Sequence, residues 1–323
     1  MTAPQPGSLG ELGEFALIAK VTEGLPAHSQ VLVGPGDDAA VVRAPAGAVV
    51  ISTDVLIEGR HFRRDWSTPI DIGRKAAAAS LSDIVAMGAR PSAVVVAFAG
   101  PPDLPSAWAL SCTAGLRAEL DALNVALVGG DVTSADSVMI TVTAIGDLEG
   151  REPVLRSGAQ IGDRIAIAGR HGWAAAGLAV LSRGFRSPKK LVDAHRFPLP
   201  PYEAGLLAAQ MGATSMIDVS DGLIADARHL ALASDVLLAI DSSLIEVPQE
   251  LASAASAYNM DPREWMLTGG DDHALLATFP ARVKIPSSFV LIGEVRASAA
   301  AGPGVSVDGH FVTGAGGHEH FRG

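Results

Sequence analysis

The sequence predicts a mixed α+β protein of two domains, and three observations support this prediction. The chain has 323 residues, a length that corresponds to about two domains. Short β-type runs alternate with longer segments of helical periodicity along the whole chain. Around Gly150 the sequence becomes rich in loop residues before the alternation resumes. We therefore expect an N-terminal mixed α/β domain over residues 1–149 and a C-terminal mixed α/β domain over residues 150–323.

The first half begins with an amphipathic helix over residues 9–24, where apolar residues recur at helical spacing. Two β-type runs, 41–43 and 49–51, flank a segment with Pro and Gly at 44–47, and this pattern predicts a hairpin. The other elements expected in this half are helices over 68–87 and 106–123 and strands at 31–33, 93–99, 125–128 and 138–145.

The second half repeats the mixture of strands and helices. A loop over 156–159 precedes a strand at 164–168, and a strand at 216–218 leads directly into a helix over 222–233. The remaining expected elements are helices over 173–182 and from 201 to about 211 and strands at 236–240, 274–279 and 289–295.

Composition and charge exclude several classes of protein. With 24 basic and 35 acidic residues the formal net charge is −11, which argues against a general nucleic-acid or acidic-membrane surface. Bound metal ions can reverse the local sign of a site, so a phosphorylated substrate remains compatible with this charge. Cys112 is the only cysteine, which excludes an internal disulfide and a thiolate zinc site. Neither a signal peptide nor a membrane-spanning run is visible, so we expect a cytoplasmic protein.

Short aspartate-bearing segments recur along the chain, and most follow an apolar run. A carboxylate beside glycine at a strand end can present oxygen ligands without burying bare charge, and six such segments suggest several hard cations that hold a polyphosphate. The segments are Gly36-Asp37-Asp38, Ser52-Thr53-Asp54, Ser82-Asp83, Gly129-Gly130-Asp131, Asp218-Val219-Ser220-Asp221-Gly222 and Gly269-Gly270-Asp271-Asp272.

Five of the six segments also have a plainer structural explanation. Gly34–Ala39 formally matches a dinucleotide fingerprint, but β-type sequence follows it instead of the helix that such a site needs. In chain order the plainer explanations are a solvated turn at Asp38, a cap or Asx-turn at 52–54, a solvated helix face at Asp83, a tight turn at 129–131 and a helix N-cap at Ser220 or Asp221.

Common catalytic signatures are missing. The sequence contains neither a P-loop nor the protein-kinase motifs. Ser220 has no Gly-x-Ser-x-Gly surroundings and no evident histidine partner, so a serine nucleophile is not expected. His318-Glu319-His320 could suggest a metal site, although a solvated tail is the commoner explanation for such a segment.

Taken together, the motifs resemble the thiamine-monophosphate kinase family, within the superfamily of aminoimidazole ribonucleotide synthetase. They keep the family's order from about residue 9 to residue 321. Besides the acidic segments, the matching pieces are Gly10-Glu11-Leu12-Gly13-Glu14-Phe15, Glu58-Gly59-Arg60-His61-Phe62, Arg156-Ser157-Gly158-Ala159 and Gly317-His318-Glu319-His320-Phe321.

The resemblance implies a homodimer in which the sheet of the N-terminal domain pairs with that of a second subunit, and a C-terminal domain that is an α/β sandwich. It implies transfer of the ATP γ-phosphate to thiamine monophosphate with several Mg²⁺ ions; a need for K⁺ is left open. The residues that match metal ligands are Asp38, Ser52, Thr53, Asp54, Asp83, Asp131, Asp218 and Asp221. Gly130, Arg156 and Ser220 match ATP contacts, and His61, Asp271 and His318 match contacts to the acceptor.

Three places depart from the family pattern. Where the family usually has Gly-Gly-Glu-Asp-Tyr this chain has Gly-Gly-Asp-Asp-His, so Asp271 is one methylene shorter and His273 replaces a tyrosine. His318 stands where the family usually has an aromatic residue that could stack on the cationic thiazolium. Near Cys112 an aromatic residue found in some relatives is missing. These changes concern the details of the pocket.

The implied chemistry agrees with the residues. The acceptor is a phosphate monoester that is mostly ionised at neutral pH, since its second pKa is about 6, so no general base is needed. The barrier is repulsion between two anionic phosphates, which Mg²⁺ can neutralise and align. We expect direct transfer without a phosphoenzyme. The alternatives are another ATP-using enzyme of the same superfamily and a non-catalytic cation-binding protein.

Overall fold

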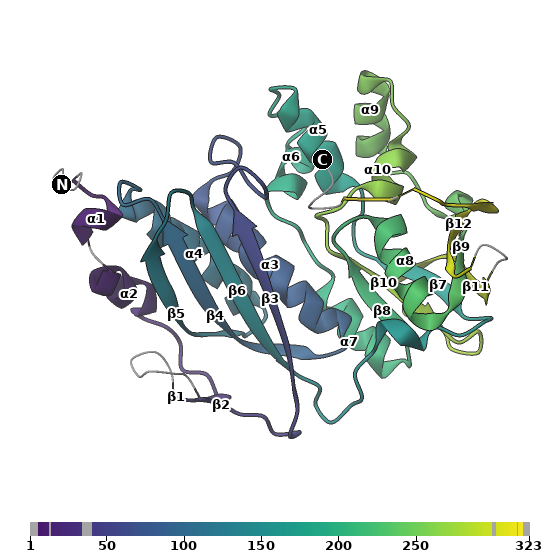
Figure 1. The fold of residues 1–323 in the computed structure, drawn as a ribbon, viewed down its shortest axis with the longest axis horizontal. Coiled ribbons are helices and arrows are strands. Elements are labelled where there is room, and N and C mark those ends of the chain that lie inside the picture. Colours follow the sequence, from purple (N-terminus) through teal and green to yellow (C-terminus); the bar gives the residue numbers. More distant parts are fainter. Residues whose placement is uncertain (1–5, 13, 34–40, 299–301, 315, 319–323) are drawn as a thin grey trace. The chain divides into compact units, whose positions relative to one another are not determined.

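The structure, a computed structural model, describes residues 6–12, 14–33, 41–298, 302–314 and 316–318. It confirms a mixed α/β fold (Figure 1). The chain divides into two compact units, which we call the N-terminal unit (Met1–Ile84 and Arg90–Gly150) and the C-terminal unit (Val85–Ala89 and Arg151–Gly323). No helix in the described part of the chain is long and apolar enough to cross a membrane.

The N-terminal unit is built on a four-stranded sheet in the order β3-β6-β4-β5. β4 and β5 are parallel, whereas β6 is antiparallel to both of its neighbours. Two long helices cover one face of this sheet (Figure 1). The bounds are β3 (Val49–Ile57), α3 (Pro69–Ala86), β4 (Arg90–Gly100), α4 (Ser106–Ala122), β5 (Ala126–Ser134) and β6 (Met139–Asp147).

The beginning of the chain differs from its prediction in two ways. The helix expected over 9–24 is divided into α1 (Leu9–Leu12) and α2 (Glu14–Thr22). The hairpin expected between 41–43 and 49–51 is wrong, because β2 (Val41–Val42) pairs with β1 (Val31–Val33) and β3 pairs with β6. β3 and β6 match over nine residue pairs, a much longer ladder than the short β2 could provide.

The C-terminal unit contains a seven-stranded sheet in the order β13-β12-β9-β11-β7-β10-β8. β12 runs parallel to β9, and the other pairs are antiparallel. The bounds are β7 (Arg164–Ala168), β8 (Ser215–Val219), β9 (Val236–Ile240), β10 (Ala274–Phe279), β11 (Phe289–Ala297), β12 (Gly304–Val307) and β13 (His310–Phe311).

Apolar layers lie on both faces of this second sheet. Ile165 and Ile167 of β7 pack in one layer with residues of α8, whereas Ala166 and Ala168 pack in the other with residues of α7. Alternation along the strand produces this division, since successive side chains point to opposite faces. The helices of this unit are α5 (Trp173–Ser182), α6 (Lys189–Arg196), α7 (Tyr202–Gln210), α8 (Leu223–Ser234), α9 (Gln249–Tyr258) and α10 (Pro262–Thr268), with short 3₁₀ helices η1 (Arg156–Gly158) and η2 (Ser242–Leu244).

Most predicted elements occur within a few residues of their expected bounds, but α6, α9, α10, β12 and β13 were not predicted. α6 lies in a polar, Pro-bearing segment between two expected helices, where no element was expected. The two late strands are only four and two residues long. Such short runs carry too little periodicity to be distinguished from loops.

Candidate active site

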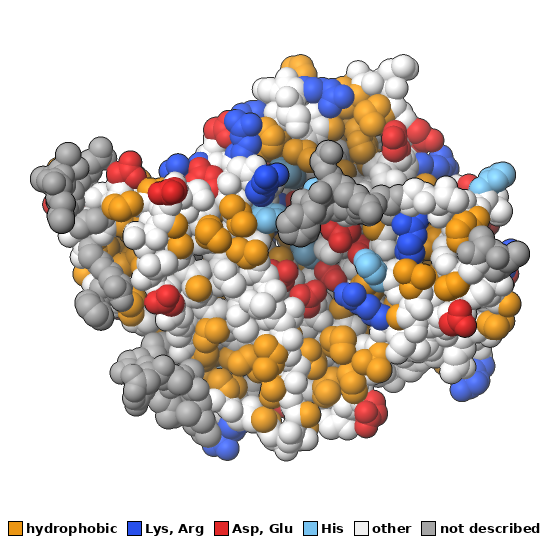
Figure 2. Space-filling model, in the orientation of Figure 1, with side chains coloured by type: hydrophobic (Ala, Val, Ile, Leu, Met, Phe, Trp, Pro, Cys, Tyr) orange, Lys and Arg blue, Asp and Glu red, His pale blue; other side chains and the backbone are white. Residues whose placement is uncertain are grey.

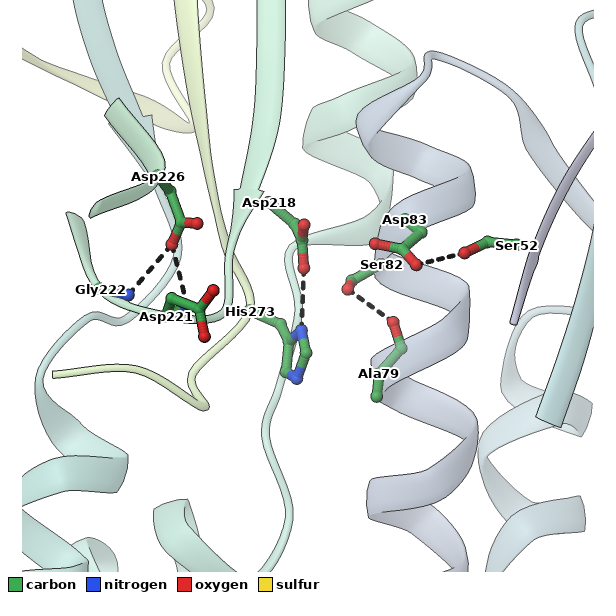
Figure 3. A network of polar contacts seen from close by, with 9 residues as sticks. All are labelled: Ser52, Ala79, Ser82, Asp83, Asp218, Asp221, Gly222, Asp226 and His273. Atoms are coloured by element: carbon green, nitrogen blue, oxygen red, sulfur yellow. Dashed lines mark hydrogen bonds and ion pairs between the residues drawn. The ribbon is translucent and has the colours of Figure 1, made fainter. Parts of the chain in front are cut away.

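In the N-terminal unit, three candidate metal ligands lie between β3 and α3. Ser52 and Asp54 are two residues apart on β3, so their side chains share the face that α3 covers. The Ser52 hydroxyl donates a hydrogen bond to Oδ2 of Asp83 on α3 (Figure 3). Oδ2 of Asp54 is buried and has no hydrogen-bond partner among the described residues. A buried carboxylate oxygen without a partner is costly and is well suited to a cation.

Two further candidates lie on the opposite, uncovered face of the same sheet. The Thr53 hydroxyl lies 2.9 Å from that of Thr143 on β6. Asp131 on β5 is in register with Ala97 and, through β4 and β6, with Val55. The side chains of Thr53 and Asp131 therefore share a face, but β6 and β4 separate their strands. Thr53 does not share a face with Ser52 and Asp54, although all three match metal ligands of the family.

Segments 52–54 and 129–131 were expected at strand ends, with a cap or Asx-turn and a tight turn as the plainer alternatives. Both expectations are wrong. Both segments lie within strands, β3 and β5. Gly130 permits the close pairing of β5 with β4, because a Cβ at this position would lie 1.9 Å from the Val96 carbonyl oxygen unless β5 shifted. Glycine in a run of β-type sequence was interpreted as the start of a turn, whereas here it permits close approach of two strands.

His61 follows β3 and is fixed by two contacts. Its Nδ1 accepts a hydrogen bond from the Ile57 amide at 2.9 Å. Its carbonyl oxygen accepts one from Nζ of Lys75 at 3.1 Å. Lys75 lies on α3 and was not singled out from the sequence, yet its side chain is buried. A lysine next to an alanine run was the available signal.

In the C-terminal unit, the Asp218–Gly222 segment connects β8 to α8. Asp218 is buried at the end of β8, and its Oδ2 lies 3.0 Å from Nδ1 of His273 (Figure 3). The N-cap of α8 is Gly222, with no side-chain cap bond, so the interpretation of Ser220 or Asp221 as the N-cap is wrong. Instead Asp226 reaches back, and its Oδ2 accepts hydrogen bonds from the amides of Asp221 and Gly222 at 3.0 Å each.

Negative charge is concentrated around this segment. The pKa of the Asp226 carboxyl is raised to about 7. Burial is the largest cause, and the nearby charges of Asp218 and Asp221 also raise it. The two amide hydrogen bonds oppose the shift. Asp226 was not among the predicted residues, and an acid four residues after Gly222 at a helix start was the signal that could have found it. Carboxylates crowded in this way favour a bound cation.

The turn Gly269–His273 packs against the same segment. The amide of Asp271 donates to the Ser220 carbonyl at 2.7 Å, and the amide of His273 donates to that of Val219 at 3.1 Å. Only glycine fits at position 270, since a Cβ would lie 2.1 Å from the Ser220 carbonyl oxygen. The two bonded segments therefore form one rigid pair of turns.

Asp271 and Asp272 have different surroundings within that turn. The Asp271 carboxylate is partly exposed, and its Oδ2 lies 3.9 Å from Nδ1 of His195. Asp272 is buried, and both of its carboxylate oxygens accept the amide of Ala174 at the start of α5, at 3.0 and 3.1 Å. Burial raises the pKa of Asp272 to about 7 against this hydrogen bond. Asp271 is therefore the one available to a ligand.

Arg156 and His318 are both exposed residues of the C-terminal unit. The Arg156 carbonyl accepts hydrogen bonds from the hydroxyls of Ser215 and Ser234, at 3.3 and 2.8 Å. The His318 amide donates to the Asp221 carbonyl at 3.0 Å. His318 is thus attached to the Asp218–Gly222 segment instead of lying in a detached tail. Asp38 lies outside the described residues.

The donor set suits a hard cation that keeps part of its hydration. Within the described ranges, no three His, Cys, Asp or Glu side chains form a complete metal site by themselves. The available donors are carboxylate and hydroxyl oxygens, and Mg²⁺ is typically held by one or two carboxylates together with waters and substrate phosphates. The unpartnered oxygen of Asp54 and the crowded carboxylates around Asp218 fit such an ion.

Cys112 does not take part in this chemistry. It is buried in α4, and burial raises its pKa to about 12. A thiol with this pKa is protonated at neutral pH and is a poor nucleophile. Cys112 is therefore not suited to the role of a reactive cysteine in an enzyme.

Known proteins resemble this chain over nearly its whole length. A family model described as AIR synthase related protein, N-terminal domain, matches residues 36–148. Thiamine-monophosphate kinase of Mycobacterium tuberculosis (strain ATCC 25618 / H37Rv) is 45% identical over 320 residues, covering 99% of this chain and 95% of that protein. The chain belongs to the thiamine-monophosphate kinase family.

Two further members of the family support this assignment. Thiamine-monophosphate kinase of Corynebacterium glutamicum is 42% identical over 296 residues, covering 89% of this chain and 87% of that protein. The solved structure of AaThiL complexed with AMPPCP and TMP superimposes with a TM-score of 0.80 at 31% identity, covering 96% of this chain and 98% of that one. Sequence and fold therefore agree on the family.

Proposed function

We propose that this protein transfers the γ-phosphoryl group of ATP to thiamine monophosphate and forms thiamine diphosphate. The observation that carries the proposal is the match to thiamine-monophosphate kinases over nearly the full chain. The structure of AaThiL with AMPPCP and TMP supports the choice of the two substrates. The other ATP-using enzymes of the superfamily and a non-catalytic cation-binding protein are less well supported.

The acidic segments of both units are proposed to supply the metal ligands: Asp38, Ser52, Thr53, Asp54, Asp83, Asp131, Asp218 and Asp221. Mg²⁺ at these oxygens would neutralise the phosphates and stabilise the transferring group. The chain's own contribution is to fix the carboxylates before substrates arrive. The hydrogen bond from Ser52 to Asp83 and the pair of turns around Asp218 both provide such positioning.

The remaining proposed contacts divide between the two substrates. Gly130, Arg156 and Ser220 would contact ATP, and His61, Asp271 and His318 would contact the acceptor. The acceptor phosphate is largely ionised at neutral pH, so it attacks directly and no residue has to remove a proton. Asp271 fits a role at the acceptor because its carboxylate is partly exposed, unlike that of Asp272.

We propose that the chain acts as a homodimer through the uncovered face of the N-terminal sheet. Figure 2 shows hydrophobic side chains gathered over this sheet, and Val49, Ile51 and Val55 of β3 are 40, 62 and 38% exposed. Thr53 and Asp131 share the face, but their strands are three strand spacings apart, or about 14 Å. One cation cannot contact both side chains of a single chain at that separation, so within one chain they would bind different ions.

The decisive experiment incubates the purified protein with ATP, Mg²⁺ and thiamine monophosphate and measures thiamine diphosphate. Formation of the diphosphate, lost when Mg²⁺ is chelated, is the expected result, and its absence would overturn the proposed activity.

Incubation with γ-labelled ATP alone should leave the protein unlabelled, and a labelled protein would contradict direct transfer. Titration with AMPPCP tests the non-catalytic alternative, which predicts no Mg²⁺-dependent nucleotide binding. The molar mass in solution tests the homodimer.

A further inference from the structure

His273 joins the two bonded turns of the C-terminal unit through its side chain. Its backbone amide donates to the Val219 carbonyl at 3.1 Å, and its Nδ1 lies 3.0 Å from Oδ2 of Asp218 (Figure 3). Both side chains are nearly inaccessible, with exposed fractions of 9% for His273 and 6% for Asp218. The contact is therefore shielded from competing water.

The chemistry of the pair fixes the direction of this hydrogen bond. A carboxylate that serves as a metal ligand is ionised and can only accept hydrogen bonds, so the tautomer of His273 that makes this bond carries its proton on Nδ1. A hydrogen bond to a charged acceptor is stronger than one between neutral groups, and burial strengthens it further. The bond holds Oδ2 of Asp218 in one orientation.

The backbone of His273 is also unusual. Its φ is +53°, in the left-handed region that side-chain-bearing residues rarely adopt, and Asp271 in the same turn has a φ of +72°. Such conformations cost free energy and persist where the surrounding structure enforces them, often at functional sites. Here the strain places the imidazole next to Asp218, directly where β10 begins.

The residue type matters at this position. Nδ1 is attached to the ring carbon that follows Cβ, so its proton is close to the backbone. A tyrosine here would carry its hydroxyl at the far end of a larger ring and could not donate from the same place. This chain therefore holds Asp218 in a way that depends on its own histidine.

We propose that His273 is a positioning residue that orients the Asp218 carboxylate for metal binding. This inference rests on the proposed function, in which Asp218 is a metal ligand. Residues that hydrogen-bond to metal ligands orient them, and their loss typically lowers metal affinity or activity by about 10- to 100-fold. Without the Nδ1 donor, Oδ2 of Asp218 loses the hydrogen bond that orients it, and part of that ordering then has to accompany metal binding.

The test compares two substitutions at position 273. His273→Ala removes the donor, whereas His273→Asn keeps an N–H at the same number of bonds from the backbone and tolerates a positive φ. The measured quantity is the Mg²⁺ concentration needed for half-maximal binding of AMPPCP. Calorimetry detects this binding, so no turnover is involved. We expect His273→Ala to raise this concentration by about tenfold or more and His273→Asn to restore it to within about threefold of the unsubstituted protein. His310→Ala, on the exposed strand β13, is the matched control and should leave it unchanged.

The outcomes separate this inference from the proposed function. If the protein forms thiamine diphosphate but His273→Ala needs no more Mg²⁺, the positioning role is wrong and the activity stands. If both substitutions raise the Mg²⁺ requirement equally, the donor is not the cause and the inference also fails. If the unsubstituted protein neither binds AMPPCP with Mg²⁺ nor forms product, both proposals fall.

A spectroscopic measurement tests the hydrogen bond without any ligand. In protein labelled with ¹⁵N-histidine, the resonances of His273 are identified by their loss in His273→Asn. A proton on Nδ1 is the expected state. An Nδ1 that lacks a proton could not donate to Asp218 and would overturn the inference even if the Mg²⁺ requirement changed.

Discussion

In the N-terminal unit the acidic side chains project from the middle of regular elements, whereas in the C-terminal unit they come from two turns that are bonded together. Asp54 and Asp83 lie on β3 and α3, and Asp131 lies within β5. Asp271 instead lies in a strained turn with two left-handed residues, and Asp218 lies in the segment bonded to that turn. A ladder or a helix positions the first group, while specific backbone contacts position the second.

This difference suggests two kinds of sensitivity to mutation. A ligand on a strand keeps its place as long as the sheet exists, so a substitution there should affect mainly the ligand itself. A ligand on the pair of turns depends on Gly270, on His273 and on the buried charges nearby. The C-terminal unit should therefore respond more strongly to changes in backbone and pH.

The largest expected effect is shared by both units. Asp131→Asn and Asp218→Asn should each lower turnover by about 10³-fold, because loss of one metal ligand removes several kcal/mol of stabilisation from the transition state. Steady-state formation of thiamine diphosphate measures the effect, and circular dichroism should show an unchanged fold. Near-normal activity in both variants would contradict the assignment of metal ligands in both units.

The next effect should appear in the C-terminal unit as a pH dependence. The pKa of Asp272 is raised to about 7 in the fold, above the 3.8 of an exposed carboxyl. Its contribution to stability is therefore complete below about pH 4 and is lost as the pH rises to about 7. Relative to the unsubstituted protein, Asp272→Asn should gain up to about 4 kcal/mol in unfolding free energy across this range.

Urea unfolding of both proteins from pH 4 to pH 8 measures that difference. Asp308→Asn is a suitable control, because hydrogen bonds from Ser242 lower the pKa of Asp308. The stabilisation by Asp308 is lost only as the pH falls below about 4, so Asp308→Asn should leave the pH dependence between pH 4 and pH 8 nearly unchanged. A difference between Asp272→Asn and the unsubstituted protein that does not vary with pH would show that Asp272 is not held as a buried carboxyl.

A pair of glycine substitutions compares the backbone of the two units directly. Gly130→Ala places a Cβ against the Val96 carbonyl, and Gly270→Ala places one against that of Ser220. β5 is at the edge of its sheet and can shift outward, whereas the bonded turns cannot. We expect losses of about 1 and about 3 kcal/mol in unfolding free energy, within the usual range for overpacking.

Chemical denaturation measures these two losses. Gly314→Ala is the control, since a Cβ there would meet nothing within 4 Å, and it should leave stability unchanged. Equal losses in Gly130→Ala and Gly270→Ala would show that the two units tolerate backbone crowding alike and would remove this part of the comparison.

The smallest effect concerns the exposed carboxylate of the bonded turns. Asp271→Ala should raise the KM for thiamine monophosphate by about tenfold, a typical loss for one charged hydrogen bond, while the KM for ATP changes less than about twofold. Initial rates with each substrate varied in turn measure both constants. Equal increases would remove Asp271 from the acceptor pocket.

Sequence reasoning identified the positions of most elements and the acidic segments, but not the local geometry of those segments. Long periodic runs such as α3 and α4 were placed closely, because their pattern is unambiguous. Gly129–Asp131 was interpreted as a turn. Glycines also occur within a strand where a neighbouring strand comes close, and the sequence alone does not distinguish the two cases. The roles of Asp226 and His273 depend on contacts between segments that are far apart in sequence, which no local pattern contains.

The division of the chain at Val85–Ala89 has a practical consequence for experiments that cut the gene. These five residues interrupt the N-terminal unit in sequence, yet Val85 and Ala86 belong to an apolar layer of the C-terminal unit together with Phe279 and Phe289. A fragment that starts at residue 151 would therefore lack part of its own interior, and one that ends at residue 150 would carry that part exposed. Co-expression of the two fragments, not either one alone, is the form in which a split version of this protein should fold.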